Sequence, residues 1–209
     1  MRSRLAYRGL PGLLWVLAVA VVAGCRTVPV PVAVQPPASG APSWNVTRPE
    51  LQGHDHFDLK GRVAVAAGKD GFSASLRWIQ AGSHSQVSLE GPLGAGAVQI
   101  TADGNSLSIV NSHGDHLDAD AARADLEARL GFDPPLGSMR YWVLGVPDPS
   151  RPAQETVDPQ QQRLQSLKQD GWQVDYAGYM PNGNGWLPSR LTVQRQGVRV
   201  RVIVNDWNL

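Results

Sequence analysis

The sequence has 209 residues, with 19 Lys and Arg side chains against 18 Asp and Glu side chains and a single cysteine. A formal charge of +1 offers no basic excess of the kind that nucleic-acid-binding domains carry, so nucleic acid is not expected as a partner. One cysteine also excludes a framework of intramolecular disulfide bonds.

The N-terminus has the layout of a secretory signal peptide. Three arginines within the first eight residues precede an uncharged apolar run over 13–22, and small residues then lead directly to Cys25. The apolar run is shorter than the roughly 20 residues of a membrane-spanning helix, which favours a cleaved signal. The two small residues Ala23 and Gly24 directly before the only cysteine resemble the bacterial lipobox, in which the cysteine is acylated. We therefore expect residues 1–24 to be removed and Cys25 to carry a lipid anchor.

The segment after the cysteine is expected to be a tether. Residues 25–48 contain five prolines among small and apolar residues and show no periodicity. A Pro-rich stretch favours extended polyproline II at about 3.1 Å per residue, so this tether could reach on the order of 60 Å. Arg26 stands where an aspartate would resemble an inner-membrane retention signal, which favours the periplasmic face of the outer membrane. Without residues 1–24, 16 basic and 18 acidic side chains remain, a net charge of −2.

Residues 49–209 are predicted to form a single β-rich domain. Apolar residues alternate with polar ones over 57–65, 72–78 and 198–204, and shorter pieces lie between these runs. Such alternation predicts half-buried antiparallel strands, and Gly-, Asn- and Asp-containing turns join them.

Two helices are expected in the middle of this domain. Asp118 can cap a helix that ends at Gly131, and Pro134-Pro135 can open a second helix that ends at Gly145. A strongly curved sheet or partly open barrel, with helices against its concave side, fits this order.

No motif in the sequence indicates an enzyme, a metal site or a cofactor. The clusters His54-Asp55-His56 and 113–116 have no defined zinc spacing, and no serine lies in a G-x-S-x-G context. A P-loop and a G-x-G-x-x-G motif are also missing. Six tryptophans follow the signal region, and a sheet rich in Val, Leu and Trp is typical of a protein with an apolar ligand cavity.

An ordered set of short motifs resembles the family of the outer-membrane lipoprotein receptor LolB. It covers about residues 50–209 and comprises G-R-V-A-V at 61–65, L-R-W-I-Q at 76–80, G-P-L-G at 91–94, R-Y-W-V-L-G at 140–145, G-W-Q-V-D-Y at 171–176, L-P at 187–188, R-V-R-V at 199–202 and N-D-W at 205–207. Each motif alone is weak, but their order, their spacing and the lipobox together are specific.

This resemblance implies a mainly β fold, an unclosed antiparallel barrel with a helical lid. It also implies a monomer that accepts client lipoproteins from the soluble periplasmic carrier LolA and inserts them into outer-membrane lipid. The client's acyl chains would occupy the apolar interior, for which the candidate residues are Val63, Val65, Leu76, Trp78, Leu89, Ile100, Met139, Trp142, Val200 and Val202. The projecting loop of the family matches Pro92, Leu93 and Gly94, with Leu93 at its tip for membrane insertion.

Other interpretations stay open at this point. Leu93 could fold inward as a plug instead of projecting. The chain could be a structural envelope lipoprotein that binds peptidoglycan or another apolar ligand, and a periplasmic hydrolase that uses the histidines is a third hypothesis. Uptake of a fatty-acid probe would separate the receptor from the structural protein.

Overall fold

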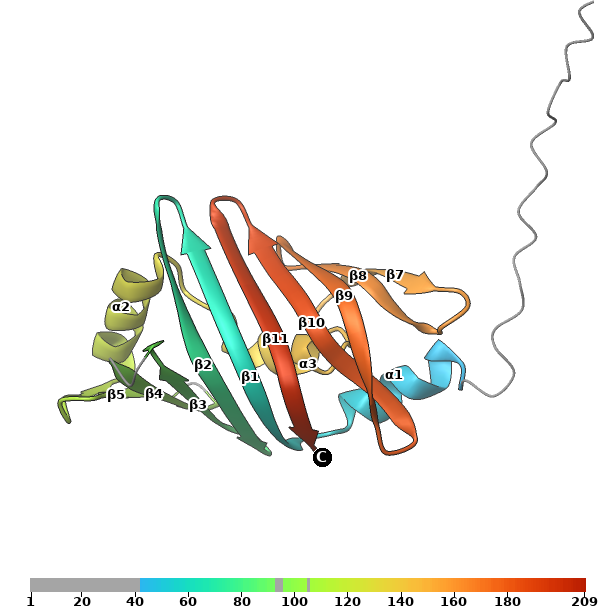
Figure 1. Cartoon of the computed structure of the whole chain (residues 1–209), viewed down its shortest axis with the longest axis horizontal. Helices are drawn as coiled ribbons and strands as arrows, with labels where there is room; N and C mark the ends of the chain where they lie inside the picture. The colour runs from blue at the N-terminus through green and yellow to red at the C-terminus, as the bar shows by residue number, and fades with distance from the viewer. Residues whose placement is uncertain (1–41, 93–95, 105) are drawn as a thin grey trace, which may run out of the picture. The chain divides into compact units, whose positions relative to one another are not determined.

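The computed structural model describes residues 42–209 with gaps at 93–95 and 105 (Figure 1). Within these residues the elements in chain order are α1 (Trp44–Gln52), β1 (His56–Ala67), β2 (Asp70–Ala81), β3 (His84–Glu90), β4 (Ala97–Asp103), β5 (Ser106–Asn111), β6 (His116–Asp118), α2 (Ala119–Leu130), α3 (Leu136–Val143), β7 (Ala153–Asp158), β8 (Arg163–Gln169), β9 (Trp172–Asn182), β10 (Gly185–Arg195) and β11 (Val198–Asn208). None of the described helices is long and apolar enough to cross a bilayer.

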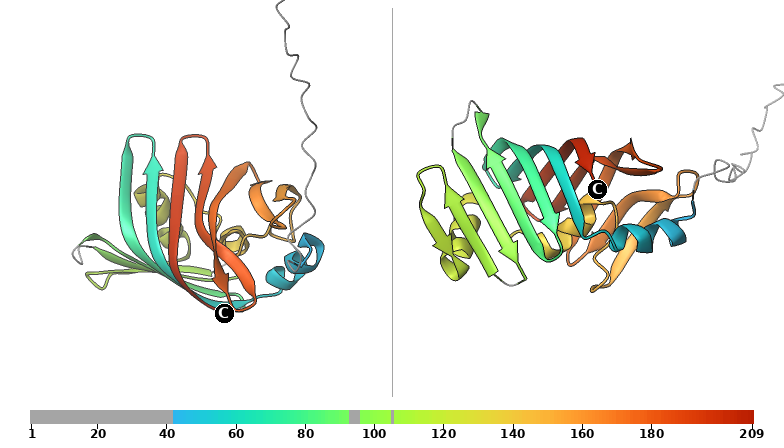
Figure 2. Two further views of the ribbon diagram at one scale, coloured as in Figure 1. Left: turned by 45° about the vertical axis from the view of Figure 1, so that its right-hand side comes forward. Right: turned by 90° about the horizontal axis from the view of Figure 1, so that it is seen from below.

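All described strands belong to one antiparallel sheet. Its order is β6-β5-β4-β3-β2-β1-β11-β10-β9-β8-β7, so the first and last strands of the chain lie side by side at its centre. The edge strands β6 and β7 do not pair with each other, and the sheet curves without closing (Figure 2). The expected unclosed antiparallel barrel is confirmed.

The concave side of the sheet carries the apolar half of each alternating strand. In β11, Val200, Val202 and Val204 are buried, whereas Arg199 and Arg201 are exposed. Successive side chains of a strand point to opposite faces, so the period-two pattern of the sequence separates core from solvent. The alternation expected for the last strand is confirmed.

One glycine is required where the two central strands approach closely. The register of β1 against β11 shifts between Lys60 and Gly61, and a Cβ on Gly61 would lie 2.1 Å from the carbonyl oxygen of Ile203. Any larger residue would push the strands apart, which explains the glycine at the start of the G-R-V-A-V motif.

The helices α2 and α3 lie on the concave side of the sheet (Figures 1 and 2). Ala122 and Leu126 of α2 are buried, and Gly131 ends this helix in the left-handed conformation with φ of 78°. A glycine adopts that conformation without a Cβ penalty. Both helices match the ranges expected from the sequence.

The folded part begins earlier than the sequence indicated. The helix α1 starts at Trp44, inside the range 25–48 expected to be tether, because the Trp44 side chain is buried and its indole N–H donates to Glu155 at 3.0 Å. The sequence did not predict this short helix because it contains Pro49, and proline inside a segment normally argues against a helix. The edge strand β7 was also not expected, since its few apolar residues give no clear alternation.

Candidate functional site

A small apolar cavity lies between the concave face of the sheet and the segment that joins α2 to α3. Its volume is about 70 Å³, and every residue that lines it is hydrophobic: Val63, Val65, Phe72, Leu76, Trp78, Val87, Leu89, Ile100, Leu130, Phe132, Pro134, Leu136, Met139, Val143, Val200 and Val202. An apolar interior with no polar side chain can bind hydrocarbon but offers no partner to a buried charge.

Nine of the ten residues that the sequence suggested for the cavity line it, and Trp142 does not. Trp142 is fully buried on another side of α3, where its indole N–H donates to the Gln169 side chain at 2.8 Å. Met139 and Val143, one helical turn apart, face the cavity instead. Trp142 therefore does not line this cavity, because its neighbours Met139 and Val143 occupy the cavity-facing stripe of α3.

Seven lining residues were not among the candidates: Phe72, Val87, Leu130, Phe132, Pro134, Leu136 and Val143. Phe72 and Val87 follow the strand alternation, and Leu130, Leu136 and Val143 follow the helical stripes, so the pattern could have found them. Phe132 and Pro134 lie in the connection between the helices, where no periodicity exists.

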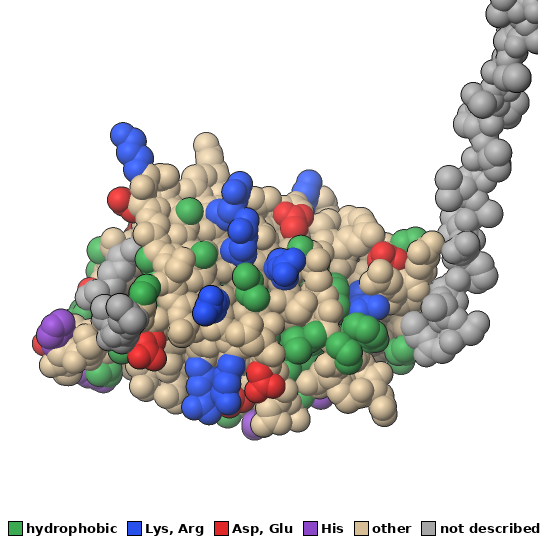
Figure 3. Space-filling view, viewed as in Figure 1, with side chains coloured by type: hydrophobic (Ala, Val, Ile, Leu, Met, Phe, Trp, Pro, Cys, Tyr) green, Lys and Arg blue, Asp and Glu red, His purple; other side chains and the backbone are tan. Residues whose placement is uncertain are grey.

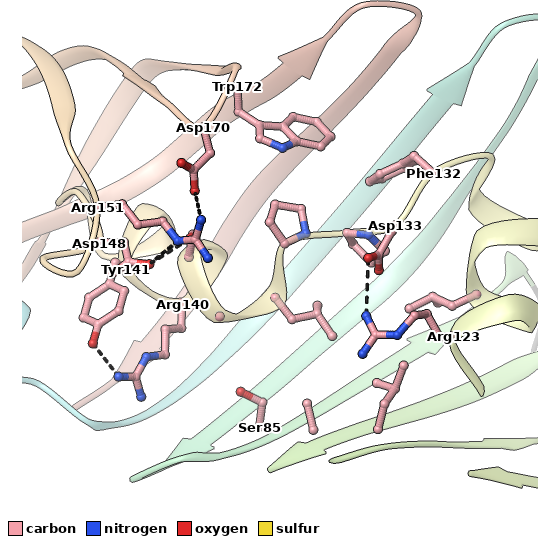
Figure 4. A pocket seen from close by; sticks show the side chains of 18 of the residues that line it. Ser85, Arg123, Phe132, Asp133, Arg140, Tyr141, Asp148, Arg151, Asp170 and Trp172 are labelled. Carbon is pink, nitrogen blue, oxygen red and sulfur yellow. Dashed lines mark hydrogen bonds and ion pairs between the residues drawn. The ribbon is translucent and has the colours of Figure 1, made fainter. Parts of the chain in front are cut away.

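A larger cleft lies on the other side of this connection. It has a volume of about 1030 Å³ and contains the charged side chains Arg123, Asp133, Arg140, Asp148, Arg151, Asp170 and Arg195. Figure 4 shows Phe132, Asp133 and Arg123 on one wall of the cleft, with Arg151 and Asp148 on the opposite wall.

The cleft and the apolar cavity share Phe132, Pro134 and Leu136. Residues 130–136, here called the lid segment, therefore form a thin partition between the two spaces. The lid segment thus separates the apolar cavity from the charged cleft.

The helix α3 is held firmly in place by buried polar groups. Gln169 accepts from the indole of Trp142 and also from the backbone N–H of Asp148 at 3.0 Å, and its amide donates to two backbone carbonyls in the loop before β7. The Ser138 hydroxyl at the start of α3 donates to Asp148 at 2.8 Å. The polar groups that make these hydrogen bonds are buried and all have partners, so they hold α3 in place against the loop before β7.

Burial would raise the pKa of the Asp148 carboxyl, but hydrogen bonds from Ser150 and Ser138 and the nearby Arg151 outweigh it, and the pKa is lowered. Asp148 is thus ionised at neutral pH and accepts from both serines.

The lid segment is held more weakly than α3. Asp133 pairs with Arg123 at 3.3 Å, and both side chains are about half exposed. Exposed pairs of this kind contribute about 0–1 kcal/mol. The ring of Phe132 also packs against Trp172, with 5.6 Å between ring centres. The exposed ion pair therefore adds little, and opening must chiefly separate the half-buried Phe132 ring from Trp172.

The remaining candidate residues are not placed in this site. Cys25, Leu93 and Gly94 lie outside the described residues, and Pro92 is exposed at the end of β3. In the part of the chain that the structure describes, no group of three or more His, Cys, Asp or Glu side chains is arranged to hold a metal ion.

Known proteins resemble both the sequence and the fold. Two relatives named outer-membrane lipoprotein LolB, from Pseudomonas savastanoi pv. phaseolicola and Pseudomonas aeruginosa PAO1, are 32% and 31% identical over 190 residues. The alignments cover 90% of this chain and 91% of the first relative, and 91% of this chain and 92% of the second.

Two solved structures have a similar fold. A LolA superfamily protein from Nitrosomonas europaea matches with a TM-score of 0.51 and 12% identity, over 81% of this chain and 94% of that one. A DUF1329 family protein from Desulfovibrio piger matches with a TM-score of 0.50 and 8% identity, over 79% and 90%. The family described as outer membrane lipoprotein LolB matches residues 55–207, and the chain belongs to this family.

Proposed function

We propose that the acyl chains of a client lipoprotein bind on the concave face of the sheet, beneath the lid segment. Membership of the LolB family makes the chain an outer-membrane lipoprotein receptor and not an enzyme. The observation that supports the proposed binding mode is the wholly hydrophobic lining of the cavity, to which the central strands β1 and β11 and the neighbouring strands β2, β3 and β4 contribute.

The chemistry of the client explains why such a cavity is needed. A triacylated lipoprotein carries about 45 methylenes, and at about 0.8 kcal/mol for each one, exposure to water would cost roughly 35 kcal/mol. A soluble carrier of the LolA type would hold these chains during the crossing. Transfer then runs to the acceptor if the acceptor binds the lipid more favourably than the donor does.

The cavity must enlarge before it can hold an acyl chain. Ligand pockets have volumes of about 300–1,000 Å³, well above the 70 Å³ found here. Outward movement of the lid segment into the neighbouring cleft of about 1030 Å³ supplies the missing space. Because α3 is fixed by Gln169 and Asp148, we expect opening to occur in residues 130–135 of the lid segment and not in α3, which begins at Leu136.

Two other parts of the chain would anchor the receptor in the membrane and deliver the client to the bilayer. The acylated Cys25 would hold the acceptor at the outer membrane, where three acyl chains exceed what stable attachment needs. The loop with Pro92, Leu93 and Gly94 would contact the bilayer during delivery. Both roles rest on the sequence.

Uptake of an environment-sensitive fatty-acid probe tests the cavity. The mature chain with Cys25→Ala should bind the probe, and a triacylated peptide should displace it. Phe132→Ala, which removes the lid-segment side chain that packs against Trp172, should accelerate uptake. Phe72→Ala is the matched control, since Phe72 lines the same cavity from β2 and should not change the rate of opening. Failure to bind the probe, together with binding to peptidoglycan, would favour the structural envelope protein.

A further inference from the structure

Four arginines gather on the outward face of the central strands. Arg62 of β1, Arg190 of β10, and Arg199 and Arg201 of β11 are all exposed, and the exposed Ile203 lies among them. Figure 3, which views this side of the sheet, shows Lys and Arg side chains spread over β1, β11 and β10. We call these four arginines and Ile203 the convex basic face.

The strand register determines how close these side chains are. Ile203 pairs with Arg62 on one side and with Arg190 on the other. Neighbouring strands are about 4.8 Å apart and residues two apart on a strand about 6.7 Å, so the four arginine Cα atoms fall within roughly 10 by 13 Å. No single strand carries this cluster, because it forms only where β11 lies between β1 and β10.

The charges of the convex basic face are not neutralised by carboxylates. None of its arginines makes an ion pair in the described part of the chain, whereas Arg48, Arg77, Arg123 and Arg151 each do. Among the acidic groups near it, Asp58 binds Arg77 and Asp175 accepts from two glutamine amides, whereas Asp206 lies at its margin, opposite Lys60 in the strand register. Four unpaired cations on a domain with more acids than bases form a distinct positive field.

We infer that the convex basic face binds the anionic phospholipid surface of the membrane. Guanidinium groups match phosphate oxygens in geometry as well as charge. The face has a single exposed apolar side chain and contributes to neither cavity, whereas a protein interface usually has an apolar or aromatic centre. An outer-membrane lipoprotein stays close to such a lipid surface throughout its working life.

This contact would orient the domain for receipt of a client. The helices α2 and α3 and the lid segment that joins them lie on the opposite side of the sheet (Figure 2), and residues of all three line the cleft. With the convex basic face against the bilayer, the cleft and lid segment point into the periplasm, where a carrier can reach them. The inference rests on the outer-membrane location and not on acyl binding in the cavity.

Vesicle sedimentation tests this inference without client or carrier. The mature chain with Cys25→Ala, which lacks an acyl anchor, is mixed with phosphatidylcholine vesicles or with vesicles that also contain about 30% phosphatidylglycerol, an anionic lipid. We expect binding to the anionic vesicles that is lost when salt rises from about 50 to about 500 mM. At about 1 kcal/mol for each arginine, Arg199→Gln with Arg201→Gln should weaken binding about 30-fold.

The matched control removes the same charge elsewhere. Arg151→Gln with Arg195→Gln removes two exposed cations that line the cleft on the opposite side of the sheet, and should leave binding close to that of the parent chain. Equal loss in the two double variants, or equal binding to both kinds of vesicle, would overturn the inference. Unchanged vesicle binding in the arginine variant, with impaired receipt from the carrier, would assign the face to an acidic protein instead.

Discussion

Replacement of Val200 by glutamate tests the assignment of the two faces of the sheet most directly. Val200 is 4% exposed, lies on β11 opposite Val65 and Val193, and lines the apolar cavity. The introduced carboxyl would meet only hydrocarbon there. Its ionised form would be unpaired, so burial would raise its pKa and the group would take up a proton in the folded state.

The cost follows from the protonation equilibrium. Keeping a carboxyl of ordinary pKa about 4.3 neutral at pH 7 costs about 3.7 kcal/mol, and loss of valine burial adds about 1 kcal/mol. The total of about 4–5 kcal/mol is a large part of the 5–15 kcal/mol that stabilises a typical domain. Because the folded-state pKa is raised, the penalty grows above pH 4.3, and at pH 5 the protonation part falls to about 1 kcal/mol.

Urea unfolding at pH 5 and pH 7, with probe uptake at each pH, measures both effects. Ile203→Glu is the control, since Ile203 is also β-branched and on β11 but faces outward with 37% exposure. We expect Val200→Glu to lose stability and uptake at pH 7 and to recover much of its stability at pH 5, while Ile203→Glu keeps both. Wild-type stability and uptake in Val200→Glu at pH 7 would show that the faces are assigned backwards.

Three further predictions concern the anchor, the loop and the buried aspartate. Cys25→Ala should yield a folded periplasmic protein that still accepts lipoproteins in solution, and failure to take a client from the carrier would show that the anchor does more than localise. Leu93→Glu should load a labelled lipoprotein normally but fail to pass it to liposomes, because a carboxylate is repelled by the apolar boundary and by anionic lipid. Normal transfer would contradict this role, and failed loading would support a buried plug. Asp148→Asn should lower the free energy of unfolding by about 1–3 kcal/mol at pH 7. Since the pKa of Asp148 is lowered, its contribution is present above the ordinary value of about 3.9 and is lost as pH falls through the folded value, so a difference between the two proteins that is independent of pH would refute the assignment.

Local patterns in the sequence determined much of the fold. The alternation over 198–204 places valines inward and arginines outward, because side chains of a strand alternate whatever the strand pairs with. The helices between Asp118 and Gly145 follow from their apolar stripes and from the glycine and proline residues at their ends, although the Asp118 side chain makes no capping hydrogen bond. Nine of the cavity-lining residues were found because each lies on the apolar side of its own strand or helix.

Only the tertiary structure decided what those elements form together. It places β11 between β1 and β10, which brings Arg62 and Arg190 to either side of Ile203. It turns Trp142 toward Gln169 and away from the cavity, and it makes Phe132 part of the partition between the cavity and the cleft. These outcomes depend on contacts between residues far apart in the chain, and periodicity reports only on neighbours.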